Sequence, residues 1–139
     1  MKKTILISIL FLMLFTTGYI YWFYYNPYSD GSRVGVIKKI SRKGNIFKTY
    51  EGELTFLVNG VIQLSDKNSN NVFYFSVTDI NLADSLDKVS GKMVKLHYVQ
   101  YRKCLPWRGE NYNGQNKESG QYIVDRIENV TEPTMTPGM

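Results

Sequence analysis

The chain has one histidine and one cysteine, and these are the first residues to consider for chemistry. His97 and Cys104 are seven residues apart, and a nucleophile–base pair would need their side chains within hydrogen-bond reach. Seven residues of extended chain span about 23 Å, so the pair forms only if the strand ends and turns back. A surface histidine and a loop cysteine are the simpler interpretation, and we predict no catalytic residue from this pair.

Carboxylates give no stronger signal for catalysis or metal binding. Glu51 and Glu53 fall on the same face of a predicted strand, about 7 Å apart. Two such groups can do acid–base chemistry, but two charges on an exposed strand edge are the simpler reading. A closed zinc site would need several carboxylates beside the one histidine and one cysteine. We therefore predict no metal site, no cofactor and no enzymatic activity.

The segment Leu105–Gly109 (Leu-Pro-Trp-Arg-Gly) is the most site-like part of the sequence. Tryptophan and arginine are enriched at binding hot spots, and loops carry function more often than cores do. Trp107 and Arg108 are therefore candidate partner contacts, with His97 of the preceding strand beside them. The alternative is that Trp107 folds back and plugs one end of the domain.

Positive charge is concentrated in one segment. Between Gly31 and Tyr50 there are six basic residues and no acidic one, whereas the chain beyond Tyr50 has nine basic against eleven acidic residues. This predicts a basic patch near the membrane exit, where anionic lipid headgroups attract lysine and arginine. An acidic protein or polymer partner and an ordinary solvated hairpin are the alternatives. The patch consists of Arg33, Lys38, Lys39, Arg42, Lys43 and Lys48.

A membrane anchor is predicted at the start of the chain. Residues 4–25 are uncharged and mostly apolar, and about 20 such residues in a helix cross a bilayer core about 30 Å thick. The run ends in aromatic residues (Tyr19 and 21–25), which favour the membrane–water boundary. A cleaved signal peptide and a buried core helix are the alternatives. Lys2 and Lys3 favour a cytoplasmic N-terminus, with the domain periplasmic or otherwise outside the cytoplasm, although Arg33, Lys38 and Lys39 oppose this orientation.

The rest of the chain predicts one small, mainly β domain over residues 30–130, after an anchor at 1–29 and before a disordered tail at 131–139. Strands are expected at 32–40, 47–58, 61–64, 72–77, 92–102 and 121–130, with a hairpin turn at Asn59-Gly60. The period changes to three and four residues from Ile80 to Val89, which predicts a short helix capped by Asp79. With 47–58 and 61–64 counted together as one hairpinned unit, the order matches a five-stranded OB-like β-barrel with one helix between its third and fourth strands. A small SH3-like barrel is the alternative.

Three segments carry a resemblance to a family. Tyr28–Gly35, Lys43–Leu54 and Leu105–Gly109 resemble those of small, single-span bacterial envelope proteins with no established activity. Some members carry a phosphogluconate dehydrogenase name. This chain has no Gly-x-Gly-x-x-Gly turn and no βαβ alternation to support that activity. The resemblance implies an architecture and an inner-membrane location.

Together these observations predict a membrane-anchored binding or assembly module of the bacterial cell envelope. Its partner would be another envelope protein, met laterally in the membrane or through the loop around Trp107. A small enzyme that uses His97 and Arg108 on an anionic substrate is the first alternative. The second is an OB domain that stacks oligosaccharide or nucleic acid on rings, although nucleic acid is not expected outside the cytoplasm. The candidate rings are Tyr50, Phe73, Tyr74, Phe75, Tyr98 and Tyr101.

Overall fold

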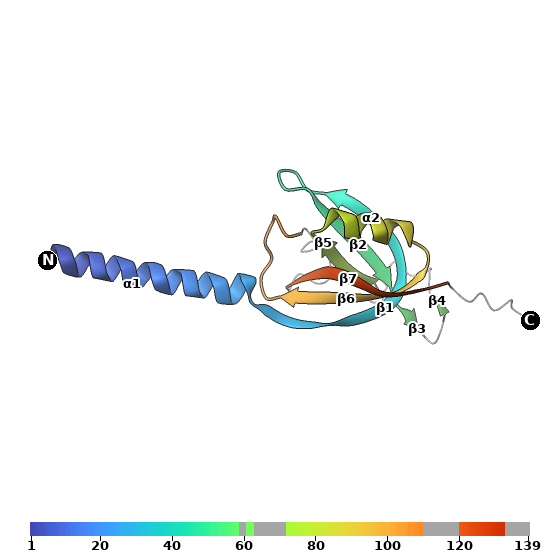
Figure 1. Cartoon of the computed structure of the whole chain (residues 1–139), viewed down its shortest axis with the longest axis horizontal. Helices are drawn as coiled ribbons and strands as arrows, with labels where there is room; N and C mark the ends of the chain where they lie inside the picture. The colour runs from blue at the N-terminus through green and yellow to red at the C-terminus, as the bar shows by residue number, and fades with distance from the viewer. Residues whose placement is uncertain (59–60, 63–71, 110–119, 133–139) are drawn as a thin grey trace, which may run out of the picture.

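The computed structural model consists of a long N-terminal helix and a small β-domain (Figure 1). It describes residues 1–58, 61–62, 72–109 and 120–132. Helix α1 (Lys2–Ile20) continues directly into one turn of π-helix, η1 (Tyr21–Tyr25), in which Asn26 N donates to Tyr21 O at 3.0 Å. The combined helix Lys2–Tyr25 has a mean hydropathy of 1.9, and none of its most apolar window is buried. It is long and apolar enough to cross a membrane.

The β-domain is built on one five-stranded sheet. The strands are hydrogen-bonded in the order β1, β2, β5, β7 and β6, and β6 pairs again with β1, so the sheet closes on itself. All neighbouring pairs are antiparallel except β5 and β7, which run parallel. These strands are β1 (Pro27–Lys43), β2 (Thr49–Thr55), β5 (Val72–Val77), β6 (Met93–Tyr101) and β7 (Gln121–Thr131).

Strand β1 is the longest element of the domain, and its length allows it to pair with two neighbours. Its first half pairs with β6 and its second half with β2. A register shift between Ile37 and Lys39 separates Ile37, which is buried in the core, from a partly exposed second half. The turn to β2 contains Gly44 with a φ of 114°, where an added Cβ would lie 1.8 Å from Phe47 O. A glycine is therefore required at this turn.

The core lies inside the closed sheet and beneath one helix. Its largest fully buried side chains include Phe73, Phe75 and Leu96, each at most 2% exposed. Helix α2 (Ile80–Lys88) lies over the sheet and buries Ala83 and Leu86 against it (Figure 1). Asp79 caps this helix by accepting a hydrogen bond from Asn81 N at 2.9 Å.

The mainly β architecture and the single short helix between the third and fourth long strands are confirmed. The predicted strand 47–58 is wrong at both ends, because residues 44–48 form a turn and the chain divides after Thr55. Strand β3 (Leu57–Val58) then pairs with β4 (Val61–Ile62). The predicted turn residues Asn59 and Gly60 lie outside the described residues, as do positions 63–64 of the predicted strand 61–64 and positions 133–139 of the predicted tail.

Candidate functional site

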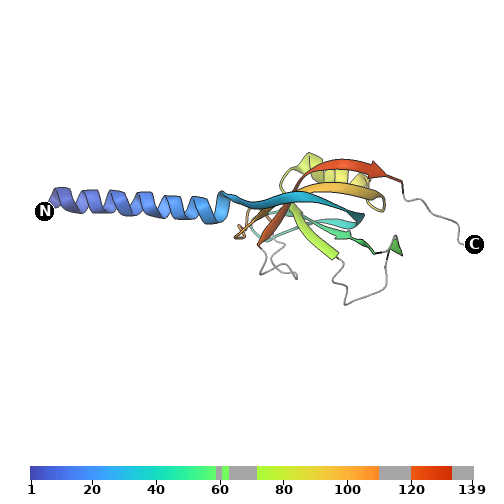
Figure 2. The same ribbon diagram turned by 90° about the horizontal axis from the view of Figure 1, so that it is seen from below.

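Two of the three segments that carry the family resemblance meet at the end of the domain that faces α1. They are Lys43–Leu54 and Leu105–Gly109. Figure 1 shows the β1–β2 turn and the segment after β6 at this end, and Figure 2 shows the segment after β6 again beside the end of α1. Phe47 of the turn contacts Trp107 of Leu105–Gly109, with ring centroids 6.0 Å apart in an edge-on arrangement. The candidate site is therefore a group of side chains built from both segments, at the end of the domain next to the N-terminal helix.

Gln121, the first residue of β7, holds Leu105–Gly109 in place. Its side chain is fully buried, and its Nε2 donates to Leu105 O at 3.3 Å and to Gly109 O at 2.9 Å. Its Oε1 accepts from Leu105 N at 3.3 Å. Gly109 lies so close to β5 that an added Cβ would be 2.1 Å from Ser76 Oγ. The buried amide of Gln121 thus satisfies backbone N–H and C=O groups of this loop, as the backbone of a neighbouring strand would in a sheet.

Arg108 joins three parts of the protein. Its Nε donates to Gln121 Oε1 at 2.6 Å, its Nη2 donates to Lys103 O at 2.8 Å, and its guanidinium carbon lies 3.6 Å from the centroid of the Tyr101 ring. Its Nη1 donates to Tyr24 O at 2.8 Å, which connects the domain to the end of the anchor helix. Burial lowers the pKa of Arg108 from its ordinary value. The predicted partner contact Arg108 is therefore used inside the protein, and we call this set of contacts the helix–domain junction.

Trp107 points away from these internal contacts. Its side chain is 52% exposed, so the alternative in which Trp107 plugs the domain is wrong. Two residues of the β1–β2 turn are also exposed, Phe47 at 48% and Ile46 at 87%. We call Ile46, Phe47 and Trp107 the apolar rim. An exposed cluster of large apolar side chains at loop tips indicates a contact surface.

Below the loop lies a buried carboxylate that sequence reasoning placed on an exposed edge. Glu51 is only 8% exposed; its Oε1 accepts from Thr49 Oγ1 at 2.8 Å and its Oε2 from Ser76 Oγ at 2.7 Å. Strand alternation predicts which face Glu51 occupies but not that a loop covers that face. Gln121 and Ser76 were missed for the same reason. Each is a polar residue in an otherwise apolar stretch of strand, Gln121 at the start of β7 and Ser76 near the end of β5.

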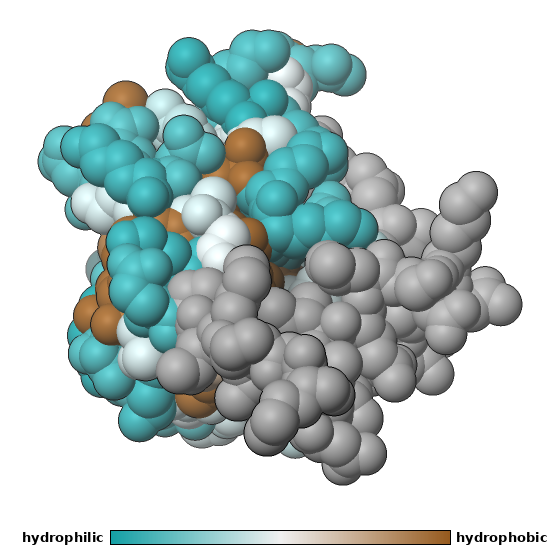
Figure 3. All heavy atoms as spheres, turned by 90° about the vertical axis from the view of Figure 1, so that its right-hand side faces the viewer, coloured by the Kyte–Doolittle hydropathy of each residue, from teal (hydrophilic) through white to brown (hydrophobic). Residues whose placement is uncertain are grey.

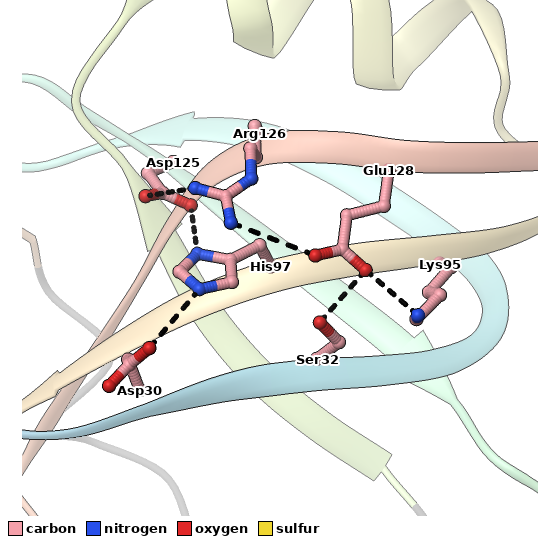
Figure 4. A network of polar contacts seen from close by, with 7 residues as sticks. All are labelled: Asp30, Ser32, Lys95, His97, Asp125, Arg126 and Glu128. Carbon is pink, nitrogen blue, oxygen red and sulfur yellow. Dashed lines mark hydrogen bonds and ion pairs between the residues drawn. The ribbon is translucent and has the colours of Figure 1, made fainter.

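His97 lies elsewhere, on the outer face of β6, in a polar network with side chains from β1 and β7 (Figure 4). Its Nδ1 is 2.6 Å from Asp125 Oδ1 and its Nε2 is 3.5 Å from Asp30 Oδ2. Both ring nitrogens therefore face a carboxylate, which leaves neither nitrogen oriented toward a substrate. His97 lies four residues before Tyr101, about 13 Å along the strand, so the structure does not bring it together with Arg108.

The same network holds Glu128 at its centre. Glu128 accepts from Ser32 Oγ at 2.9 Å and pairs with Lys95 Nζ at 3.1 Å, while Arg126 lies 3.7 Å from its other oxygen. The hydrogen bond from Ser32 and the charge of Lys95 lower the pKa of Glu128.

The predicted basic patch is divided between two places. Arg33 is half-buried, and its guanidinium packs on aromatic rings at the core, 4.4 Å from the centroid of Phe73 and 5.2 Å from that of Tyr98. The remaining members are exposed: Lys38 and Lys39 lie at the register shift in the middle of β1, whereas Arg42, Lys43 and Lys48 lie near or in the β1–β2 turn.

Chemical groups suited to catalysis do not converge in the described part of the candidate site. Among the described residues, no three His, Cys, Asp or Glu side chains lie close enough to hold a metal ion. Cys104 is half-buried, and burial raises the pKa of its thiol, which disfavours the reactive thiolate. The arrangement is suited to binding through the apolar rim and the cations around it.

Fold and site together define a small closed β-domain joined firmly to an apolar helix that is able to cross a membrane. Residues 27–113 match the family model described as "Domain of unknown function (DUF8785)". This match covers more than half of the chain, and the chain belongs to that family. It begins at the first residue of β1, so α1 and β7 lie outside it. No curated protein and no solved structure matches the chain.

Proposed function

We propose that this protein is a single-pass protein of the bacterial inner membrane whose β-domain, outside the cytoplasm, is a binding and assembly module for another envelope protein. The helix–domain junction is the observation that carries this proposal. Keeping a domain near a membrane requires only a flexible linker. A fixed orientation relative to the helix lowers the entropic cost of meeting a partner that lies in the same membrane.

The strand order supports assigning the domain to the OB-like class. In that class a closed five-stranded sheet has a helix between its third and fourth strands, as β5 and β6 have here. The loops between strands one and two and between strands four and five bind ligands in OB-folds. The corresponding segments here carry Phe47 and Trp107, so the apolar rim occupies the usual position of an OB binding surface.

The lateral route to a partner is supported by the shape of α1. One face of the helix forms a shallow groove of about 430 Å³ whose floor is Gly18, where an added Cβ would meet nothing within 4 Å. Small residues allow two membrane helices to approach closely, and flanking rings provide packing area. The groove is lined by Phe11, Leu14, Phe15, Gly18, Tyr19, Trp22 and Phe23. We propose that a helix of the partner packs there.

The alternatives receive less support from the geometry. His97 and Arg108, the residues of the enzyme alternative, are each engaged by neighbours in separate places. Polymer binding would need several exposed rings in one groove, yet Phe73 and Phe75 are buried and Tyr101 lies beneath Arg108.

The test is crosslinking of the tagged full-length protein in native membranes, followed by capture and identification of the linked proteins. Gly18→Leu fills the proposed helix groove. Thr16→Leu places the same leucine side chain about 160° away around the helix and is the matched control. Trp107→Ala tests the loop route, whereas a change of Arg108 would disturb the junction and is not used.

The expected result is one envelope protein that is captured by the native chain and by Thr16→Leu but lost in Gly18→Leu. Loss in Trp107→Ala with retention in Gly18→Leu would contradict the lateral route. Recovery of no specific protein by any form would overturn the assembly function.

A further inference from the structure

The apolar rim lies where a membrane surface would be if α1 spans the bilayer. Trp107 is adjacent to Arg108, whose guanidinium donates to Tyr24 O in the last turn of the helix. Phe47 contacts Trp107, which places the β1–β2 turn at the same end of the domain (Figure 1). Tryptophan and other aromatic side chains favour the headgroup region of a bilayer.

Exposed positive charges surround the apolar rim. Lys43 and Lys48 flank Ile46 and Phe47 in the turn, and Lys103 precedes the loop of Trp107. Apolar side chains with lysines beside them are the composition of segments that bind the surface of anionic membranes.

Arg102 adds an independent observation at the same end. Its guanidinium carbon lies 5.7 Å from the centroid of the Trp22 ring and 5.1 Å from that of Tyr28. Its Nη1 is the only buried side-chain nitrogen or oxygen without a hydrogen-bond partner in the part of the chain that the structure describes. This half-buried guanidinium places a further positive charge beside the end of the helix, where it adds to the attraction for anionic headgroups.

We propose that the domain has a second membrane contact: Ile46, Phe47 and Trp107 enter the interface of an anionic phospholipid bilayer while Lys43, Lys48 and Lys103 bind headgroup phosphates. This inference depends on the membrane anchoring proposed above. The opposite end of the domain offers a contrast, since its described surface is mainly hydrophilic with hydrophobic atoms between (Figure 3). A bilayer, unlike a protein partner, is necessarily present beside the end of a membrane-spanning helix.

The two tryptophans of the chain allow the anchor and the rim to be tested separately. In Trp22→Phe, Trp107 is the only tryptophan; in Trp107→Phe, Trp22 is the only one. Both full-length proteins are reconstituted into vesicles of phosphatidylcholine and phosphatidylglycerol, with and without brominated acyl chains that quench tryptophan fluorescence on contact. Circular dichroism confirms that each variant is folded.

We expect brominated lipid to quench both tryptophans, and acrylamide in the water to quench Trp107 weakly. Quenching of Trp22 but not of Trp107 would overturn the docking proposal and leave the anchor intact. Quenching of neither would overturn the anchor itself. Protection of Trp107 from acrylamide without quenching by brominated lipid would show that protein covers the rim, which also overturns the proposal.

The charge requirement is tested on the same Trp22→Phe background. Lys43→Gln with Lys48→Gln is expected to reduce the quenching of Trp107 in vesicles that contain phosphatidylglycerol. The matched control is Lys88→Gln with Lys92→Gln, which should leave the quenching unchanged. Lys88 is exposed at the end of α2, and Lys92, just before β6, is half-buried and paired with Glu132. Equal effects of the two pairs, or no effect of either pair, would contradict a role of headgroup charge.

Discussion

Arg108 shows how one side chain can connect two parts of a protein. A planar guanidinium donates in several directions at once, and here it reaches Gln121, Lys103 O and Tyr24 O while it covers the Tyr101 ring. Sequence reasoning selected Arg108 because arginine is frequent at binding hot spots. Residue type and loop position do not reveal whether such donors are used inside the protein or by a partner.

We predict that Arg108→Lys destabilises the domain, because an ammonium group cannot replace three divergent donors and leaves Gln121 Oε1 poorly paired. The expected loss is about 2–3 kcal/mol in the free energy of unfolding, measured by urea denaturation of the full-length protein in detergent. Arg126→Lys is the matched control, because Arg126 is exposed and should change stability by less than about 0.5 kcal/mol. Equal losses would contradict the role of Arg108.

A second residue-scale prediction concerns Glu128 and pH. Because the pKa of Glu128 is lower in the folded protein than in the unfolded chain, its contribution to stability is present above the unfolded pKa and is lost as pH falls through the folded pKa. Ser32→Ala removes the largest cause of the shift, so the pKa of Glu128 should rise toward its ordinary value. NMR titration of the Glu128 carboxyl carbon measures this directly. An unchanged titration in Ser32→Ala would contradict the role of the Ser32 hydrogen bond and leave Lys95 and Arg126 as the causes of the lowered pKa.

At the scale of elements, periodicity predicted the strands and the short helix but not how they cover one another. The alternation around Glu51 correctly gives a strand, yet it reads the same whether a loop covers that face or water does. The extension of β1 from Pro27 to Lys43 was also missed, because its first residues are polar and pair with β6 mainly through their backbone. Contacts between segments distant in sequence decided both cases.

Gly109 gives an element-scale prediction. An added Cβ would lie 2.1 Å from Ser76 Oγ and 2.3 Å from Ser76 Cβ, so Gly109→Ala should push the loop away from β5. Overpacking of this kind costs about 1–3 kcal/mol, and a lower urea midpoint would report it. Pro106→Ala, an exposed change in the same loop, is expected to leave the midpoint nearly unaltered. A Gly109→Ala protein as stable as the native one would mean that the loop does not pack there as described.

At the scale of the whole molecule, the N-terminal helix and the domain are connected in two ways. The chain runs from η1 to β1 with only Asn26 between them, and Arg108 donates a hydrogen bond to Tyr24 O. The sequence predicted both parts and their order. It did not predict their firm connection, since Arg108 is separated from Tyr24 by 84 residues.

Inserting a Gly-Ser linker after Asn26 should release this connection. We expect the domain to remain folded and to stay at the membrane through the apolar rim, but to lose its fixed orientation relative to α1. A pair of spin labels, one on α1 and one on the domain, would report this in vesicles as a broader distribution of distances. The captured partner should be lost together with the fixed orientation. A distance distribution as narrow as in the native chain would show that contacts other than the junction fix the orientation.

The position of β7 also determines when this protein is able to fold. β7 is the last strand in the chain but lies between β5 and β6 in the sheet, so the ring of strands stays open until residues 121–131 have left the ribosome. Pairings between strands so far apart in sequence form slowly. The nascent domain thus cannot close its sheet at the time when α1 is already available for membrane insertion. If the domain lies outside the cytoplasm, as proposed above, it would cross the membrane in this unclosed form.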